Sequence, residues 1–416
     1  MTMEKASYTT IGKITAPINR FIHLEYTSGL VLFLSVLIAI IWANSPFHAS
    51  YHHFWETNLS PVLGQFTLDM PLHRWVNDGL MAVFFFVIGL ELKREFMGGE
   101  LSTLKKAGLP VMAALGGMIF PAGIYLLINK GSSSAHGWGI PMATDIAFAL
   151  ALLSMAGKHI PPSLKIFLSA LAVADDLGAV LVIAFFYTAE LNFVPLLFAA
   201  ALLLVLTAGN KMGITHKAFY LLTGLLVWAG FLLSGVHATI AGVLVAFTIP
   251  NYAARCKETP SRQQKPLPPM EIPLQQETPL QQIENGLHPW VAFLIMPLFA
   301  LANAGIVIGA SFFTDLLNPI STGVIGGLVF GKFTGVLLFT WIMVKLGFAQ
   351  LPERASWLHI AGVALLAGVG FTMSLFVSNL AFKNPQFIEQ AKYGILTASV
   401  VSGVAGLFLL KYLKKK

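Results

Sequence analysis

Charged residues and cysteine are scarce in this sequence. Only 11% of its 416 residues are charged and 56% are hydrophobic, whereas an ordinary soluble domain has roughly 25% charged residues. Too few polar side chains are present to cover a soluble core, so the composition predicts a chain that faces lipid over most of its length. The single cysteine, Cys256, excludes an intramolecular disulfide and a paired-thiol metal or redox site.

Hydrophobic runs extend almost from end to end, and no polar stretch is long enough to fold separately. We therefore expect one all-α polytopic membrane domain over residues 1–416, with about 12 transmembrane helices. Several runs are shorter than the roughly 20 residues that span about 30 Å of hydrocarbon, so about eleven or thirteen spans are the alternatives. The runs lie at about Gly29 to Asn44, Val76 to Leu92, Ala107 to Asn129, Ile140 to Ala156, Leu164 to Tyr187, Val194 to Leu206, Ala218 to Leu233, Val236 to Ile249, Pro289 to Gly309, Thr322 to Leu346, Trp357 to Ser378 and Tyr393 to Leu410.

The Lys and Arg positions indicate an orientation, because short cytoplasmic loops carry an excess of positive charge. With the N-terminus inside, Arg74, Lys130, Lys383 and Lys392 fall outside the cell, and Lys332 falls within a span. The other 21 of the 26 basic residues fall in the cytoplasm, so we expect both termini to be cytoplasmic. The net charge of +7 follows from this topology, and no nucleic-acid partner is expected.

Two segments outside the spans have distinct compositions. Residues about 62–76 alternate apolar and polar side chains from Phe66 to Trp75, which indicates a short external β-hairpin. Residues about 251–285 are rich in Pro and Gln, which predicts a flexible cytoplasmic linker between two halves.

Four ionisable residues lie well inside apolar runs: Asp145, Asp175, Asp176 and Lys332. Each costs roughly 2.5 to 3.5 kcal/mol near the bilayer centre, so four together indicate a functional site. The Asp175-Asp176 pair and Lys332 each lie about midway along their runs, and therefore at a similar depth. Because adjacent helical residues point about 100° apart, one aspartate can meet Lys332 while the other lines a wet cavity. We expect an ion site at mid-membrane.

Structural ion pairs that only hold helices together are the alternative interpretation. A single Asp-Lys pair would fit it, but three acids against one base leave two carboxylates that need protons or cations. Small residues near the aspartate pair, such as Ala172, Gly178 and Ala179, allow neighbouring helices to approach and leave room for water. These features favour the ion site.

Two spans carry signs of an interrupted helix. Thr144 and Asp145 follow the glycine- and proline-containing segment from Gly137 to Pro141, and such segments break helices. The second candidate is Gly368 to Ser374, midway along a later span. Glycines that serve only tight helix packing would explain the second segment equally well.

The two spans run in opposite directions, as expected of inverted-topology repeats, which we place at about 107–187 and 322–410. Substrate would bind where the two broken helices cross at mid-membrane. Half-helix ends carry partial charges, positive at N-termini and negative at C-termini, and Asp145 and Lys332 could each neutralise one set.

Seven motifs in order along the chain match one known family. They are Asn77 to Phe85 leading to Gly89 to Glu91, Ala143 to Phe148, Leu171 to Asp176, Ser234 to Thr239, Leu298 to Gly305, Gly331 to Lys332, and Gly370 to Ser374. With these motifs the sequence resembles the NhaA family of bacterial sodium/proton antiporters over essentially its whole length. Seven ordered motifs are far more specific than any single one.

The resemblance implies roles for the intramembrane residues. Asp175 and Asp176 would form the Na+ and proton site, Thr144 and Asp145 would lie at a broken helix, and Lys332 would be the basic partner. The family's fold includes the inverted repeats that the two interrupted spans suggest.

The resemblance also assigns residues away from the ion site. The second broken-helix segment is implied at Gly370, Phe371 and Thr372. A pH-sensing cluster at the cytoplasmic gate is implied at Glu91, Arg94, Glu95, Glu284 and His288. Family members often carry a second histidine where this chain has Asn285, so the resemblance does not supply the pH threshold. The hairpin at about 62–76 resembles the family's dimer contact and implies a homodimer.

We therefore expect a secondary antiporter in the bacterial inner membrane that exports Na+, and also Li+, in exchange for H+ by alternating access. Two protons exchanged for one Na+ would make the cycle electrogenic. Its partners would be the transported ions and membrane lipids, with no cofactor, and we expect a transporter and not an enzyme. Salt tolerance and pH homeostasis are the roles that would follow.

Three other functions are compatible with charged residues in the membrane. An intramembrane aspartyl protease needs aspartates on separate helices and a Gly-x-Gly-Asp motif, which this sequence lacks. A sodium-solute symporter on a similar fold would show Na+ uptake stimulated by an organic solute. A channel fits discrete titratable sites less well than a transporter does.

Overall fold

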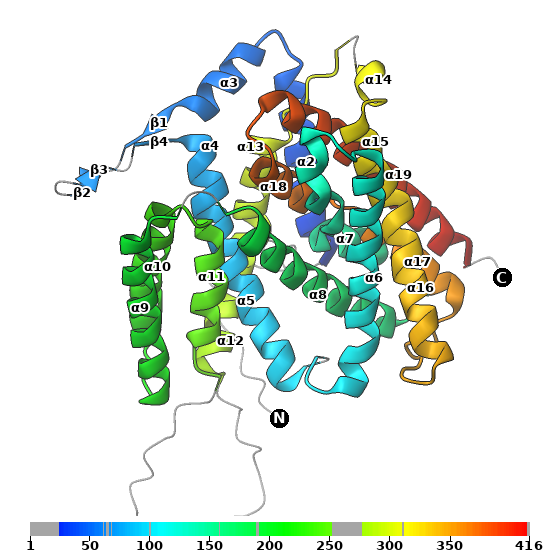
Figure 1. Ribbon diagram of the computed structural model, residues 1–416. Helices are drawn as coiled ribbons and strands as arrows, with labels where there is room; N and C mark the ends of the chain where they lie inside the picture. The colour runs from blue at the N-terminus through cyan, green and yellow to red at the C-terminus, as the bar shows by residue number, and fades with distance from the viewer. Residues whose placement is uncertain are drawn as a thin grey trace, which may run out of the picture. The chain divides into compact units, whose positions relative to one another are not determined.

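The computed structural model describes most of the chain in two compact units (Figure 1). The described residues are 25–60, 62–63, 66–67, 69–99, 101–157, 159–188, 191–251, 277–309 and 312–413. The first unit comprises Met1–Asn77, Glu100–Tyr187 and Ala292–Lys416, and the second comprises Asp78–Gly99 and Thr188–Val291. Both segments predicted to be inverted repeats, about 107–187 and 322–410, belong to the first unit.

The first unit is built from helices of very different lengths. In chain order they are α2 (Glu25–Ala43), α3 (His48–Glu56), α4 (Leu72–Arg74), α6 (Leu104–Ile128), the 3-10 helix η2 (Ser133–Met142), α7 (Ile146–Ala156), α8 (Pro162–Phe186), α13 (Met296–Asn303), α14 (Phe312–Asp315), α15 (Pro319–Ile325), the π-helix η4 (Gly326–Gly331), α16 (Lys332–Lys345), α17 (Trp357–Ala367), α18 (Phe371–Ala381) and α19 (Pro385–Tyr412).

The second unit contains α5 (Met81–Gly98), α9 (Phe193–Lys211), α10 (Lys217–Ser234), α11 (Ala238–Thr248) and α12 (Pro279–Trp290). Two π-helices, η1 (Trp75–Leu80) and η3 (Val291–Ile295), lie where the chain passes between the units. Helices α5 and α11 approach closely, because a Cβ at Gly242 would lie 2.3 Å from the carbonyl oxygen of Ala82.

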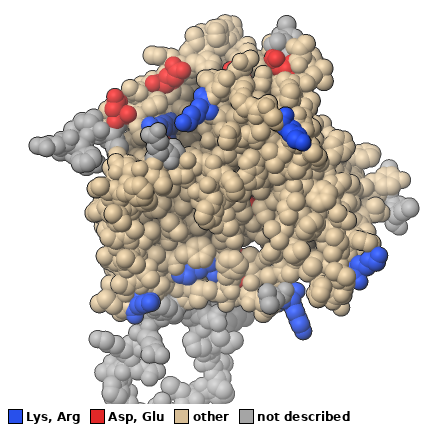
Figure 2. Space-filling view, viewed as in Figure 1, with Lys and Arg blue, Asp and Glu red and all other residues tan. Residues whose placement is uncertain are grey.

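The helices have the length and composition of membrane spans. Among the described residues, eight are long and apolar enough to cross a membrane, or up to 11 if each of three bent helix pairs is one span. The range predicted at Val236 to Ile249 matches α11, which is a shorter apolar helix. Figure 2 shows that uncharged residues form most of the visible surface.

The structure corrects the limits of the predicted hairpin at 62–76. Strand β1 (Asn58–Leu59) pairs with β4 (Met70–Pro71), and β2 (Val62–Leu63) pairs with β3 (Phe66–Thr67), both antiparallel. Strand pairing therefore begins before the predicted range, and residues 72–76 are helical. Their apolar members, at positions 72, 75 and 76, have the i, i+3, i+4 spacing of one helical face, which short alternation does not distinguish from a strand.

The structure also corrects the end of the predicted linker at 251–285. Helix α12 begins at Pro279, where the Thr278 hydroxyl accepts from the Gln281 N–H and the Gln281 side chain accepts from the Thr278 N–H at 3.0 Å. Threonine, proline and glutamine at these positions are helix-start signals, although the same residue types are common in linkers. Residues 252–276 of the predicted linker lie outside the described residues.

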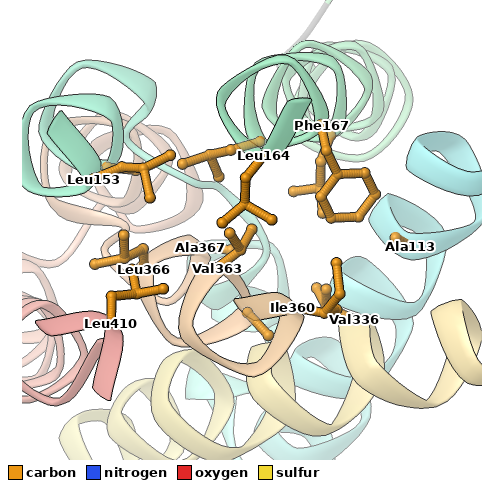
Figure 3. Packing of buried hydrophobic residues seen from close by; sticks show 14 of the residues in the cluster. Ala113, Leu153, Leu164, Phe167, Val336, Ile360, Val363, Leu366, Ala367 and Leu410 are labelled. Atoms are coloured by element: carbon orange, nitrogen blue, oxygen red, sulfur yellow. The ribbon is translucent and has the colours of Figure 1, made fainter. Parts of the chain in front are cut away.

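A hydrophobic core joins six helices of the first unit (Figure 3). Ala113 comes from α6, Leu153 from α7, Phe167 from α8 and Val336 from α16, and all four side chains are buried. Val363 and its neighbours on α17 lie among them, and α19 contributes from its C-terminal end. Such a core depends on close packing, since lipid is as apolar as these side chains.

Helices α6 and α16 meet backbone to backbone. A Cβ at Gly116 would lie 2.2 Å from the carbonyl oxygen of Gly335, and a Cβ at Gly335 would lie 2.1 Å from that of Gly116. Only glycine fits both positions without a shift of the helices. Because Lys332 lies one turn before Gly335, this contact also sets the position of Lys332.

We expect Gly116→Ala to destabilise the protein by about 1 to 3 kcal/mol, because the added methyl group forces α6 and α16 apart. Gly123→Ala is the matched control on the same helix, since a Cβ there would meet nothing within 4 Å beyond the nearby backbone of its own helix. Thermal unfolding of the purified proteins in detergent measures both. Equal melting temperatures for the two variants would contradict the close approach of the helices.

Candidate functional site

Two helix interruptions of the first unit face each other. Helix η2 ends at Met142 and α7 begins at Ile146 with a bend of 42°, and α17 and α18 are separated by a bend of 43°. The Asp145 N–H donates to the carbonyl of Val369 at 2.7 Å. The structure therefore contains a break at both places where the sequence predicts one, and it brings the breaks together.

Asp145 bridges the N-termini of two half-helices. One carboxylate oxygen accepts from the Phe148 N–H at 3.1 Å and caps α7. The other accepts from the Thr372 N–H at 3.0 Å and from the Thr372 hydroxyl, at the start of α18. Helix N-termini carry partial positive charge, so this single buried carboxylate compensates two of them.

Lys332 forms an ion pair with Asp175. Its ammonium contacts the Oδ2 atom of Asp175 and donates to the Thr144 hydroxyl at 2.8 Å. The Thr144 oxygen in turn lies 2.7 Å from the same Oδ2 atom and 2.9 Å from the carbonyl of Ala367. All three side chains that meet here are fully buried. The structure thus selects Asp175 as the aspartate that meets Lys332.

The surroundings of Lys332 are unusual in backbone and in packing. It follows directly on the π-helix η4, a type of segment that is frequent at functional sites. Gly117 on α6 lies beside its aliphatic chain, since a Cβ there would be in ordinary van der Waals contact with the lysine Cδ, at 3.5 Å. The Oδ1 atom of Asp175 is buried and has no hydrogen-bond partner among the described residues.

Asp176 is also fully buried, one position further along α8. It points about 100° away from Asp175 around the helix axis. Its charge interacts electrostatically with the Lys332 ammonium. The site therefore holds two adjacent carboxylates and one ammonium away from solvent, which suits a monovalent cation that is bound and released. No group of three or more His, Cys, Asp or Glu side chains that could hold a metal ion is found in the described part of the chain.

The residues implied as a pH-sensing cluster come together in the second unit. Arg94 on α5 pairs with Glu284 on α12, at 3.0 Å between Nε and Oε1, and with Glu95 at 3.1 Å. Glu91 interacts electrostatically with Glu284 and Arg94, and His288 interacts with Arg94. Arg94 is therefore the centre of the cluster.

A second polar cluster in the first unit received no role from the sequence. The Asn303 amide donates to the Oδ1 atom of Asn77 at 2.9 Å, and the Asn379 amide donates to the Oδ1 atom of Asn303 at 2.7 Å. The Nε2 atom of His73 lies 3.1 Å from the same Asn303 oxygen. Asparagine inside apolar runs was the available signal, since a buried amide needs partners.

Comparisons with known proteins agree with this architecture. The family described as "Na+/H+ antiporter 1" matches residues 19–410. The Na+/H+ antiporter NhaA of Oleidesulfovibrio alaskensis is 46% identical over 97% of this chain and 95% of its own length. The corresponding protein of Sulfurimonas denitrificans is 45% identical over 97% of both chains.

A solved structure has a similar fold at low sequence identity. The sodium proton antiporter MjNhaP1 from Methanocaldococcus jannaschii aligns with a TM-score of 0.50 and 13% identity. The alignment covers 96% of this chain and 99% of that one. At this identity the likeness concerns the fold alone.

We expect Lys332→Ala to lower the free energy of unfolding by about 3 to 5 kcal/mol, because it leaves the buried Asp175 carboxylate without its cation. Lys332→Arg, which keeps the charge, should lose less. The double variant Lys332→Ala, Asp175→Asn should recover part of the loss, since the amide carries no charge. Thermal unfolding in detergent measures each variant, with the exposed Lys345→Ala on the same helix as control. Equal losses for Lys332→Ala and Lys345→Ala would contradict the pairing.

Proposed function

The chain belongs to the Na+/H+ antiporter 1 family, and on that premise we propose that it exports Na+, and also Li+, in exchange for protons that enter the cell. Its helices make it a multi-pass membrane protein, and its relatives are antiporters and not enzymes. The observation that carries the proposal is the burial of Asp175 and Asp176 side by side, with Lys332 against one of them.

The ion pair supplies the exchange step of the proposed mechanism. Na+ needs oxygen ligands and negative charge, which ionised Asp175 and Asp176 provide. The Lys332 ammonium would repel Na+ at the same place, so it must lose its proton or withdraw before Na+ binds. Protons and Na+ therefore occupy the site alternately, and no cofactor is required.

Alternating access is the means by which we propose that this site opens to each side in turn. We also propose that the segments at about 107–187 and 322–410 are the inverted repeats on which this mechanism depends. In each predicted repeat the middle element is a broken helix, η2 with α7 in the first and α17 with α18 in the second, with bends of 42° and 43°. Na+ is proposed to bind where these two broken helices meet.

We propose about 12 spans in the bacterial inner membrane, with both termini in the cytoplasm. The helix lengths allow up to 11 membrane spans among the described residues, and the shorter helix α11 would be the twelfth. The orientation follows from the Lys and Arg distribution. We further propose a homodimer through the hairpin between Asn58 and Pro71, and physiological roles in salt tolerance and pH homeostasis.

Control by pH is proposed for the cluster around Arg94. Glu284 is buried and contacts the Arg94 guanidinium with both oxygens, at 3.0 and 3.2 Å, so a change in its protonation alters a short charge-assisted contact between α5 and α12. Proton binding in such a cluster can bias a conformational equilibrium without any contribution to the transport site.

We expect Asp176→Asn to abolish exchange without impairing membrane insertion or thermal stability. The amide has nearly the same shape as the carboxylate, but it can neither carry a negative charge nor bind and release a proton. Proteoliposomes with an internal pH dye measure Na+-dependent proton flux. Asp315→Asn is the control, since it removes a carboxylate on the short helix α14 outside the site. Normal flux in Asp176→Asn would contradict the assignment of Asp176 to the ion site.

We expect exchange to be electrogenic. If Asp176 and Lys332 each release a proton before one Na+ binds, two protons enter for each Na+ exported. At 100 mV, negative inside, the net charge gains about 2.3 kcal/mol, which supports roughly a fiftyfold Na+ gradient. The potential can be clamped with K+ and valinomycin while Na+ efflux is followed at equal pH on both sides. Flux that is independent of the potential would refute the two-proton cycle and leave the antiporter assignment intact.

We expect Glu284→Gln to move the pH profile of transport toward lower pH by several tenths of a unit or more without lowering the maximal rate. Loss of one negative charge favours proton release from the carboxylates that remain around Arg94. The control is Glu277→Gln, an exposed carboxylate that contacts the Asn285 amide. A variant inactive at every pH would place Glu284 in the transport site instead.

A further inference from the structure

A cavity of about 1060 Å³ lies in the first unit, away from the residues that meet at Asp145 and Lys332. It is formed by the first turns of α6, the first turns of α8 and the loop between α16 and α17. Neither the proposed ion exchange nor the pH-sensing cluster uses it. Its lining combines two kinds of side chain, basic ones and apolar ones.

The basic side chains in the cavity lining are Lys105, Lys106 and Arg354, against one carboxylate, Glu353. Arg354 has a φ of 59° and is the one non-glycine residue with positive φ in the described part of the chain. The Ser163 hydroxyl donates to the carbonyl of Glu353 at 2.6 Å and so ties this loop to the start of α8. The cavity lining therefore has an excess of positive charge.

The apolar part of the lining includes large side chains that remain accessible. Ile166 on α8 is 50% exposed and Phe348 in the loop is 68% exposed, while Leu109 and Phe167 are buried beside them. A free inorganic anion would gain nothing from these side chains. A ligand with an anionic group and an alkyl chain would contact both parts of the lining.

The last turn of α16 indicates the depth of the cavity in the membrane. The Lys345 ammonium lies 4.4 Å from the centre of the Trp341 ring, and Trp341 is 45% exposed. Trp and Lys side chains with this partial exposure are typical of the level of the lipid headgroups. The cavity-lining loop follows directly, with Gly347 and Phe348, so the cavity lies at that level.

We propose that this cavity binds an anionic phosphate ester, and that the occupant is a phospholipid of the surrounding membrane. The phosphate would lie between Lys105, Lys106 and Arg354, since guanidinium and ammonium groups bind phosphate strongly. The alkyl chain would lie along Ile166 and Phe348. Because α8 also carries Asp175, occupancy of the cavity acts on the helix that holds the ion pair.

Thermal unfolding of the full-length protein in detergent tests the proposal. Phosphatidylglycerol should raise the melting temperature of the wild type more than phosphatidylcholine with the same acyl chains. The difference between the two increases in melting temperature should fall by at least half in the double variant Lys105→Gln, Arg354→Gln. It should persist in a control double variant, Lys217→Gln, Lys411→Gln, which removes two basic residues outside the cavity. An undiminished increase in the cavity variant would overturn the proposal.

Further measurements distinguish a phospholipid from a free phosphate ester and test whether the cavity variant has lost its response only because it is misfolded. Lys105→Arg, Arg354→Lys keeps both charges and should keep the response to phosphatidylglycerol; its loss would count against recognition by charge. Glycerol 3-phosphate should stabilise the wild type much less, and an equal effect would overturn the assignment to a lipid. Phe348→Gln should weaken the response to phosphatidylglycerol, and an unchanged response would remove the alkyl chain from the site.

Discussion

The buried ion pair between Lys332 and Asp175 is the interaction on which the rest of the first unit depends. A charge away from water is tolerated only with a partner of opposite sign and with further hydrogen bonds, which Thr144 supplies. The pair requires α16, α8 and the end of the broken helix before α7 to meet at one point. The backbone contact of Gly116 with Gly335 holds α16 at the distance that this meeting needs.

Asp145, next to the ion pair, compensates the partial positive charges of two half-helix N-termini. Breaking two helices in the buried interior creates two N-termini whose N–H groups need partners away from solvent. One carboxylate accepts from Phe148 on α7 and from Thr372 on α18, so each break stabilises the other. Each helix interruption is therefore stabilised by the other. Together they place Thr144 where it contacts the ion pair.

The same arrangement explains why a stable ion pair is compatible with ion exchange. The ion pair exists only while Lys332 is protonated and Asp175 is ionised. In the proposed cycle Lys332 releases a proton, and this release removes the ion pair at the same time. Asp176 provides the second charge, which interacts electrostatically with the Lys332 ammonium. The cluster around Arg94 belongs to the second unit, and the proposed regulation therefore requires coupling between groups on different units.

Composition, run length and motif spacing by themselves determined that the chain crosses the membrane, where most of its helices lie, which charges fall within apolar runs and which family it resembles, because hydrophobicity and helix breaking are local properties. They did not separate Thr278 and Pro279 from a linker or Leu72 from a strand, since those residue types suit both structures. Only the tertiary structure decided that Asp175 and not Asp176 meets Lys332, because that choice depends on the rotation of α8 about its axis relative to α16. The Asn77–Asn303 network and the basic cavity likewise join segments distant in the sequence, and no local pattern records which distant side chains come together.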